Sequence, residues 1–124
     1  MEVVTATSVD VRHPPACIVD GNASTFWSST GLFPQEFVLR LPAKASLAKL
    51  RIRCANVKHI VVERCDGASP VSFAPYVEEK LPDTDGLQDA TIVTPSFPVT
   101  FLKFRILSGF VDYIMIYSVE IETK

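Results

Sequence analysis

The sequence is poor in cysteine and histidine, and this shortage removes several classes of protein from consideration. It holds three cysteines and two histidines in 124 residues. Cys17, Cys54 and Cys65 match no zinc-binding spacing, so we expect reduced thiols, although spacing alone leaves a disulfide between two of them open. Neither His13 nor His59 lies in a motif with a nucleophile, a phosphate loop or a second ligand. The sequence therefore contains few of the residue combinations that an enzyme active site requires.

An excess of charge and a long hydrophobic run are also missing. The net charge is only -2, and acidic residues are spread along the chain, so no basic surface for nucleic acid or an anionic bilayer is indicated. Apolar runs are short and interrupted, and the N-terminus lacks a basic segment followed by an apolar stretch and a cleavage site. We therefore expect neither a membrane span nor secretion.

Helical periodicity is almost absent, and short runs of β-branched and aromatic residues recur between turn-forming residues instead. This pattern predicts an all-β sandwich or barrel. The length and a 48% apolar composition fit one domain, which we place at 1–124. We expect two facing sheets with strands at 3–9, 36–41, 46–54, 59–65, 72–78, 90–93, 101–107 and 115–122.

A polar turn at Asp20-Gly21-Asn22 leads directly into Thr25 and the only tryptophan, Trp27. A carboxylate, a hydroxyl and several turn carbonyls are the ligands that a hard cation such as calcium prefers. The alternative is an ordinary turn in which Thr25 caps a short helical turn. We expect Trp27 to be buried, because large aromatic side chains at such positions usually belong to the core.

Leu32 and Phe33 lie in a loop between Gly31 and Pro34. The sequence leaves two interpretations of this pair open. The side chains either plug one end of the sandwich or form an exposed contact.

Several short blocks occur in an order that resembles the discoidin domain, also called the coagulation factor F5/8 C-type or galactose-binding-like domain. The blocks are Asp20-Gly21-Asn22 with Thr25-Phe26-Trp27, then Phe37–Leu41, Glu63–Gly67, Phe101–Arg105 and Ser118–Glu122. The resemblance spans nearly the whole chain. It implies a jelly-roll β-sandwich of about eight strands.

Two further blocks, His13-Pro14-Pro15 and Thr30–Phe37, are similar to the intraflagellar transport members of that superfamily. This resemblance implies a non-catalytic subunit of the intraflagellar transport B complex. Such a subunit forms a heterodimer with a Rab-like small GTPase, intraflagellar transport protein 27, in the cytoplasm and the cilium or flagellum. Secreted discoidin domains usually join their two ends by a disulfide, and the absence of cysteine near either end of this sequence favours an intracellular member.

The resemblance also implies a structural calcium ion that joins the first loop to the last strand. The backbone carbonyls of Cys17 and Asn22, the Asp20 carboxylate and the Thr25 hydroxyl and carbonyl would bind it from the loop. Val119 and Glu120 would add a carbonyl and a carboxylate from the last strand.

A GTPase partner would require a surface of apolar, aromatic and arginine side chains. The candidate partner-binding residues are Arg51, Arg53, Arg64, Lys103 and Arg105. The alternative interpretation is that these cations lie on solvent-exposed sheet faces and only keep the protein soluble. A carbohydrate- or phospholipid-binding module is the alternative function, because one fold hosts many functions.

Overall fold

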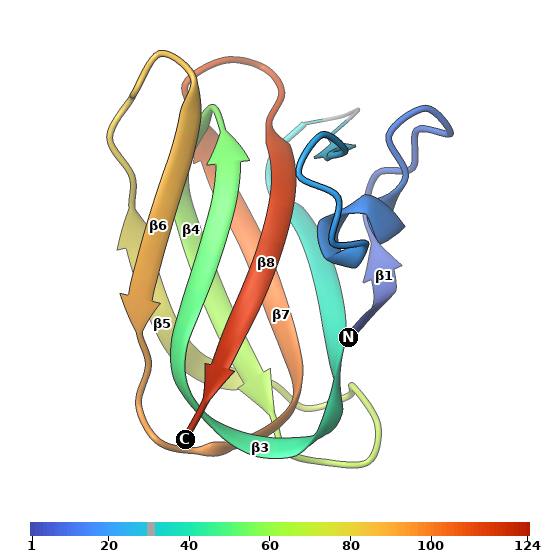
Figure 1. The fold of residues 1–124 in the computed structure, drawn as a ribbon, viewed down its shortest axis with the longest axis vertical. Helices are drawn as coiled ribbons and strands as arrows, with labels where there is room; N and C mark the ends of the chain where they lie inside the picture. Colours follow the sequence, from blue (N-terminus) through green and yellow to red (C-terminus); the bar gives the residue numbers. More distant parts are fainter. Residues whose placement is uncertain (30–31) are drawn as a thin grey trace.

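The computed structural model describes residues 1–29 and 32–124, and these form a β-sandwich (Figure 1). The strands of the described residues are β1 (Glu2–Ala6), β2 (Trp27–Ser28), β3 (Gln35–Ala55), β4 (Val57–Cys65), β5 (Ala74–Lys80), β6 (Leu87–Val93), β7 (Pro98–Gly109) and β8 (Met115–Thr123). A 3₁₀ turn, η1 (Pro15–Val19), follows β1. The jelly-roll β-sandwich expected from the sequence is confirmed.

The two layers share one long strand. In the first sheet the order is β1, β3, β7, β4, β5, and in the second it is β2, β8, β3, β6, with every pair antiparallel. Residues 35–46 of β3 pair with β7, whereas residues 47–55 pair with β6 and β8. Figure 1 shows β3 curving from one layer into the other at the lower end of the molecule.

The prediction of two separate strands at 36–41 and 46–54 is therefore wrong. Pro42, Ala43 and Lys44 suggested a turn, but the backbone stays extended through them. The register shift between Arg40 and Ala45 marks where the strand changes sheets. The two-residue strand β2 was missed because it is too short to display an alternating pattern.

The core lies between the sheets and follows the alternation along the strands. Trp27 is fully buried, as predicted, and its indole N–H donates to the Ser8 carbonyl oxygen at 3.0 Å. The Phe37 ring meets Trp27 edge-on at 5.4 Å and stacks on Phe104 at 4.8 Å between ring centroids. These rings join the first loop to both layers.

The three cysteines are free, as the sequence predicted. Cys54 and Cys65 are buried, and burial raises the pKa of the Cys54 thiol to about 12. The Cys65 Sγ–H donates to the Ser69 carbonyl oxygen at 3.4 Å. Cys54 and Cys65 therefore act as small apolar side chains in this fold.

The loop before β3 resolves one open question. Leu32 is 90% exposed, whereas Phe33 is half-buried and packs against the core. Leu32 is thus a surface residue and Phe33 is a partial plug. Thr30 and Gly31, which belong to the block similar to the transport members, lie outside the described residues.

Candidate functional site

The first loop is shaped by its own sequence. Pro15 begins η1 with a φ angle suited to the first helical position. Ile18 is the buried residue of η1, so it anchors the turn on the core. Asp20 ends the turn, and Gly21 has φ +73°, a left-handed conformation that glycine adopts without strain. The chain then reverses toward Thr25.

Oxygen atoms of three loop residues lie close together. Thr25 Oγ1 lies 2.7 Å from Asp20 Oδ2 and 3.1 Å from the Asn22 carbonyl oxygen. The Asn22 N–H donates to Asp20 Oδ1 at 2.9 Å. The Thr25 hydroxyl, and then the Asn22 amide, stabilise the carboxylate and lower the pKa of Asp20. The loop thus holds an ionised carboxylate beside a hydroxyl and a carbonyl.

The loop lies beside β8, across a shallow groove. The groove measures about 300 Å³, and its lining includes Gly21, Val119 and Glu120. Val119 is buried, while the Glu120 carboxylate lies 3.9 Å from Arg51 Nη1 on the outer face of the second sheet. Within residues 1–29 and 32–124, no three or more His, Cys, Asp or Glu side chains group as a metal site would require. β8 thus borders the loop, and the Glu120 carboxylate on that strand also lies near Arg51.

Arg51 and Arg53 share the outer face of the second sheet. Arg51 Nε–H and Nη2–H donate to the two Asp89 carboxylate oxygens at 3.0 and 2.7 Å. This pairing lowers the pKa of Asp89 and raises that of Arg51. Arg53 Nε is 3.7 Å from the same carboxylate. Arg51 thus occupies both Asp89 oxygens, and Arg53 is left with the weaker contact.

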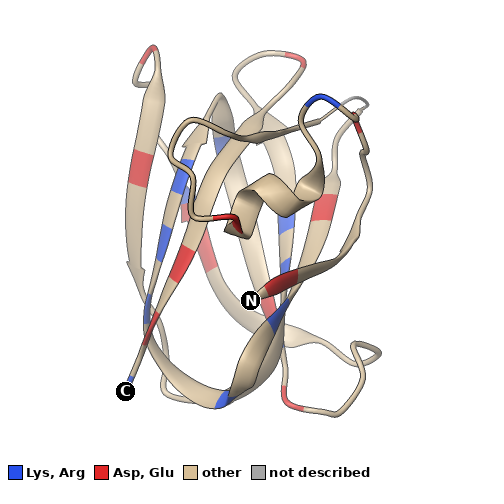
Figure 2. Cartoon of the chain, turned by 45° about the vertical axis from the view of Figure 1, so that its right-hand side comes forward, with Lys and Arg blue, Asp and Glu red and all other residues tan. Residues whose placement is uncertain are grey.

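The other predicted cations lie elsewhere. Arg105 Nε–H donates to Glu36 at 2.7 Å, and Lys103 Nζ lies 4.6 Å from the centre of the Phe73 ring, both on the first sheet. Arg64, in β4, has its guanidinium carbon 4.2 Å from the Phe97 ring centre. A single face holding all five predicted cations does not exist, because β3 carries Arg51 and Arg53 into the opposite layer. Figure 2 shows Lys and Arg on strands of both layers, interspersed with Asp and Glu.

An apolar band crosses the outer face of the second sheet, and sequence reasoning missed it. Ala55 pairs with Leu87 of β6 on one side and with Met115 of β8 on the other. Tyr117, two residues after Met115, lies against Phe26 with 5.1 Å between ring centroids. We call Leu87, Ala55, Met115, Tyr117 and Phe26 the apolar band.

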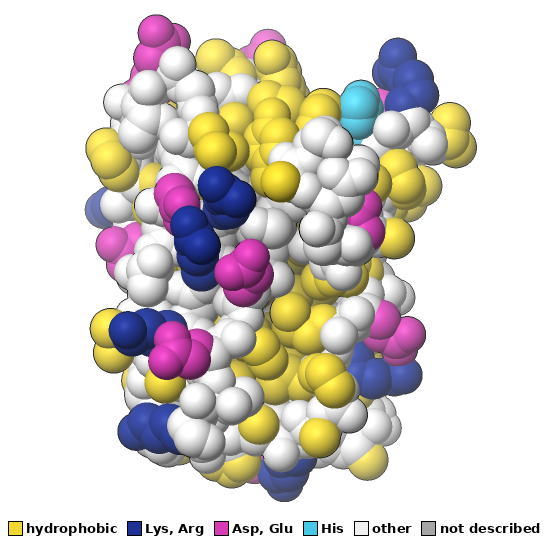
Figure 3. Space-filling view, in the orientation of Figure 1, with side chains coloured by type: hydrophobic (Ala, Val, Ile, Leu, Met, Phe, Trp, Pro, Cys, Tyr) yellow, Lys and Arg dark blue, Asp and Glu magenta, His cyan; other side chains and the backbone are white. Residues whose placement is uncertain are grey.

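His13 extends the apolar band. Its ring stacks on Phe26 at 4.1 Å, with an interplanar angle of 15°. Figure 3 shows apolar side chains gathered over the upper parts of β3 and β8, beside the cyan histidine and above a charged region. The sequence analysis missed Leu87 because it placed the start of this strand at residue 90, three residues later than the structure does.

No family model matches the chain. The fold is that of the carbohydrate-binding, discoidin-like jelly rolls. A CBM32 module from Clostridium perfringens, solved with GalNAc-β-1,3-galactose, superposes with a TM-score of 0.83 at 18% identity, covering 96% of this chain and 93% of that chain. At that identity the likeness concerns the fold alone.

The chain belongs to the intraflagellar transport protein 25 family. It is 39% identical over 122 residues to the mouse intraflagellar transport protein 25 homolog and 38% identical to the human one. Each match covers 98% of this chain and 85% of the relative. The family therefore associates the chain with cilia and flagella. No helix among the described residues has the length and apolar character needed to span a membrane.

Proposed function

We propose that this chain is a non-catalytic subunit of the intraflagellar transport B complex that forms a heterodimer with the Rab-like small GTPase intraflagellar transport protein 27. The observation that carries the proposal is similarity, over 98% of the chain, to proteins named for intraflagellar transport. Within the proposal, the heterodimer works in the cytoplasm and the cilium or flagellum.

Co-expression tests the heterodimer. The chain and the GTPase are produced together and separated by size-exclusion chromatography with light scattering. We expect one peak with the mass of one copy of each subunit. A monomeric chain with the GTPase eluting separately would exclude the heterodimer.

We also propose a structural calcium ion between the first loop and β8. The Asp20 carboxylate, the Thr25 hydroxyl and the Asn22 carbonyl already lie together, and all three are oxygen donors of the kind calcium takes. The Cys17 and Thr25 carbonyls and the backbone of Val119 would complete the set. Glu120 would contribute its carboxylate only after leaving Arg51. The ion's role is to hold the loop against the last strand, since it neutralises the Asp20 charge there.

Thermal unfolding tests the ion. Calcium should raise the melting temperature of the wild-type chain, because an ion that binds only the folded state stabilises it. Asp20→Asn should abolish this rise. Asp66→Asn, in another exposed loop, should retain it. An equal rise with calcium in wild type and Asp20→Asn would refute the assignment.

A carbohydrate- or phospholipid-binding module is the second candidate function. The cluster of His13, Phe26 and Tyr117 supports it, because half-exposed aromatic faces accept sugar rings. A glycan array and a vesicle pull-down discriminate the two functions. Specific binding that is lost in Phe26→Ala would favour the module over the transport subunit.

A further inference from the structure

We infer that the GTPase subunit docks on the upper outer face of the second sheet, where the apolar band adjoins Arg53. This inference rests on the proposed heterodimer and adds the surface and the chemistry of the contact. The partner is expected to present apolar side chains to the band and a carboxylate to Arg53.

The apolar band is partly exposed on both sides of Ala55, which is itself buried. Leu87 is 50% exposed at the free edge of the second sheet, and Met115, Tyr117 and Phe26 are each partly exposed. Tyr113, exposed in the loop before β8, lies two residues from Met115. Single exposed apolar residues are common, but a contiguous group marks a contact surface.

The first sheet has a different outer face. Val38, Cys65 and Phe101 form a small apolar cluster there, but Phe73 and Val4 pack over it. Its cations are also engaged, since Lys103 lies over the Phe73 ring and Arg105 pairs with Glu36. On the first sheet, other side chains cover the outer apolar cluster. On the second sheet, the apolar band is exposed to solvent at Leu87 and partly exposed beyond it. The second sheet is therefore the better docking face.

Arg53 determines the charge that the partner must bring. Arg51 donates to both oxygens of Asp89, and Arg53 Nε is buried with no hydrogen bond in the described part of the chain. The Arg53 side chain is 35% exposed, so a partner can reach it. The exposed part of the Arg53 side chain carries a positive charge, and a carboxylate of a partner that paired with it would gain a charge-assisted hydrogen bond.

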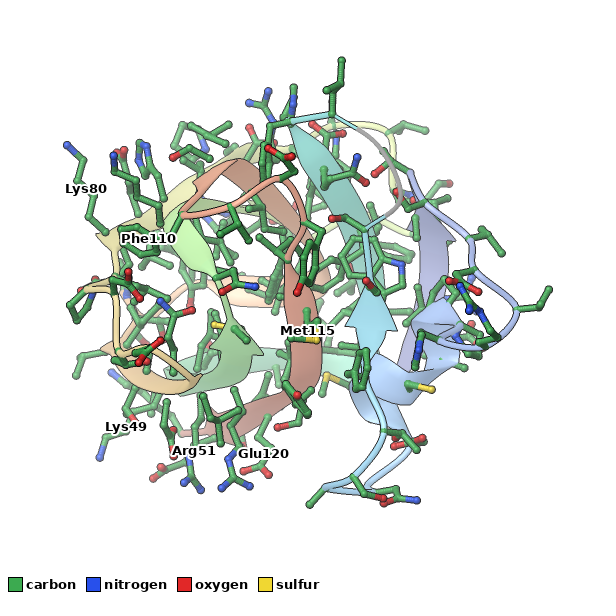
Figure 4. All side chains as sticks on the ribbon, turned by 90° about the horizontal axis from the view of Figure 1, so that it is seen from above. Lys49, Arg51, Lys80, Phe110, Met115 and Glu120 are labelled. Carbon is green, nitrogen blue, oxygen red and sulfur yellow. The ribbon has the colours of Figure 1, made fainter. Side chains whose placement is uncertain are left out.

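The position of Arg53 joins this charge to the apolar band. Arg53 and Ala55 are two residues apart and lie on the same side of β3. Figure 4 shows Arg51 and Glu120, which pair with each other, projecting outward from the same sheet. Arginine, aromatic residues and methionine are the residues enriched at the centres of protein interfaces.

Binding measurements with the purified GTPase test the surface. Leu87→Glu places a charge in the apolar band, and Arg53→Met keeps the apolar stem while removing the guanidinium. We expect each to raise the dissociation constant at least about tenfold. Val93→Glu is the matched control, because Val93 lies on the same strand and face but at the other end, 75% exposed. It should bind as wild type does.

The outcomes separate this inference from the proposed function. If wild type does not bind the GTPase, both are overturned. If wild type binds and both Leu87→Glu and Arg53→Met bind equally well, only the docking surface is wrong. Self-association of the chain alone, abolished by Leu87→Glu, would assign the surface to a second copy and overturn the inference. Thermal unfolding of each variant confirms that it is folded before binding is measured.

Discussion

At the scale of single residues, Gln88 is a buried polar side chain whose hydrogen-bonding capacity is filled by other segments. Its Oε1 accepts the Val57 N–H at 3.0 Å and the Cys54 Sγ–H at 3.4 Å. Its Nε2 donates to the Val57 and Pro82 carbonyl oxygens at 2.7 and 2.9 Å. The side chain therefore joins β6 to the end of β3, the start of β4 and the loop before β6, next to the apolar band.

Replacing Gln88 with leucine should be strongly destabilising. Gln88→Leu keeps a side chain of similar size but leaves the Val57 backbone groups without their partner. We expect the free energy of unfolding to fall by about 2 to 4 kcal/mol in urea titrations. Thr91→Leu, at an exposed position of the same strand, should change it by less than about 0.5 kcal/mol. Equal effects in the two variants would show that the Gln88 hydrogen bonds contribute nothing.

Gly109 lies so close to neighbouring atoms that only glycine, which has no Cβ, fits there without a shift. A Cβ there would lie 2.8 Å from the Asn56 carbonyl oxygen, 2.8 Å from Phe33 Cζ and 2.9 Å from Ile114 Cγ2. We expect Gly109→Ala to lower the free energy of unfolding by about 1 to 3 kcal/mol, because neighbouring backbone must move. Gly86→Ala meets nothing within 4 Å and should be neutral or slightly stabilising. A neutral Gly109→Ala would contradict the packing described here.

At the scale of elements, the ion pair between Arg51 of β3 and Asp89 of β6 joins two neighbouring strands. Arg51 lowers the pKa of Asp89 below the ordinary aspartate value of about 3.9. A carboxyl group whose pKa is lowered by folding stabilises the protein above its unfolded pKa. That contribution is lost as the pH falls through the lower folded value.

The acid limb of the stability curve should therefore change when Asp89 is replaced. We expect Asp89→Asn to lower stability at neutral pH and to make its decline below about pH 4 shallower than in wild type. Urea midpoints measured across that range test this. Asp66→Asn, an exposed carboxyl without such a partner among the described contacts, is the control. Parallel acid limbs in wild type and Asp89→Asn would be evidence against the coupling.

At the scale of the whole molecule, the two outer faces of the sandwich differ. The loop between β4 and β5 folds over the first sheet and covers its apolar cluster through Phe73. The second sheet carries charged pairs around its middle, and the apolar band lies above them (Figure 3). A surface of mixed charge that carries an open apolar band suits a subunit that binds another protein.

Hydrogen exchange in the proposed heterodimer should reveal this asymmetry. We expect amide protection to rise in β6 and in the loop before β8 when the GTPase is added, because both border the apolar band. The edge strand β5 of the first sheet should exchange at an unchanged rate. Protection confined to β5, with β6 unaffected, would place the contact on the first sheet and contradict the proposed docking surface.

Alternating residues and turn formers in the sequence were enough to predict an all-β sandwich, a buried Trp27 and a polar loop from Asp20 to Thr25. These features depend on near neighbours in the chain, because a strand's period of two decides which side chains face inward. Tertiary structure alone decided that β3 is one strand shared by both sheets. It also decided that Ala55, Leu87 and Met115 lie side by side. Pairing between strands distant in sequence determines such neighbours, and local pattern carries no record of it.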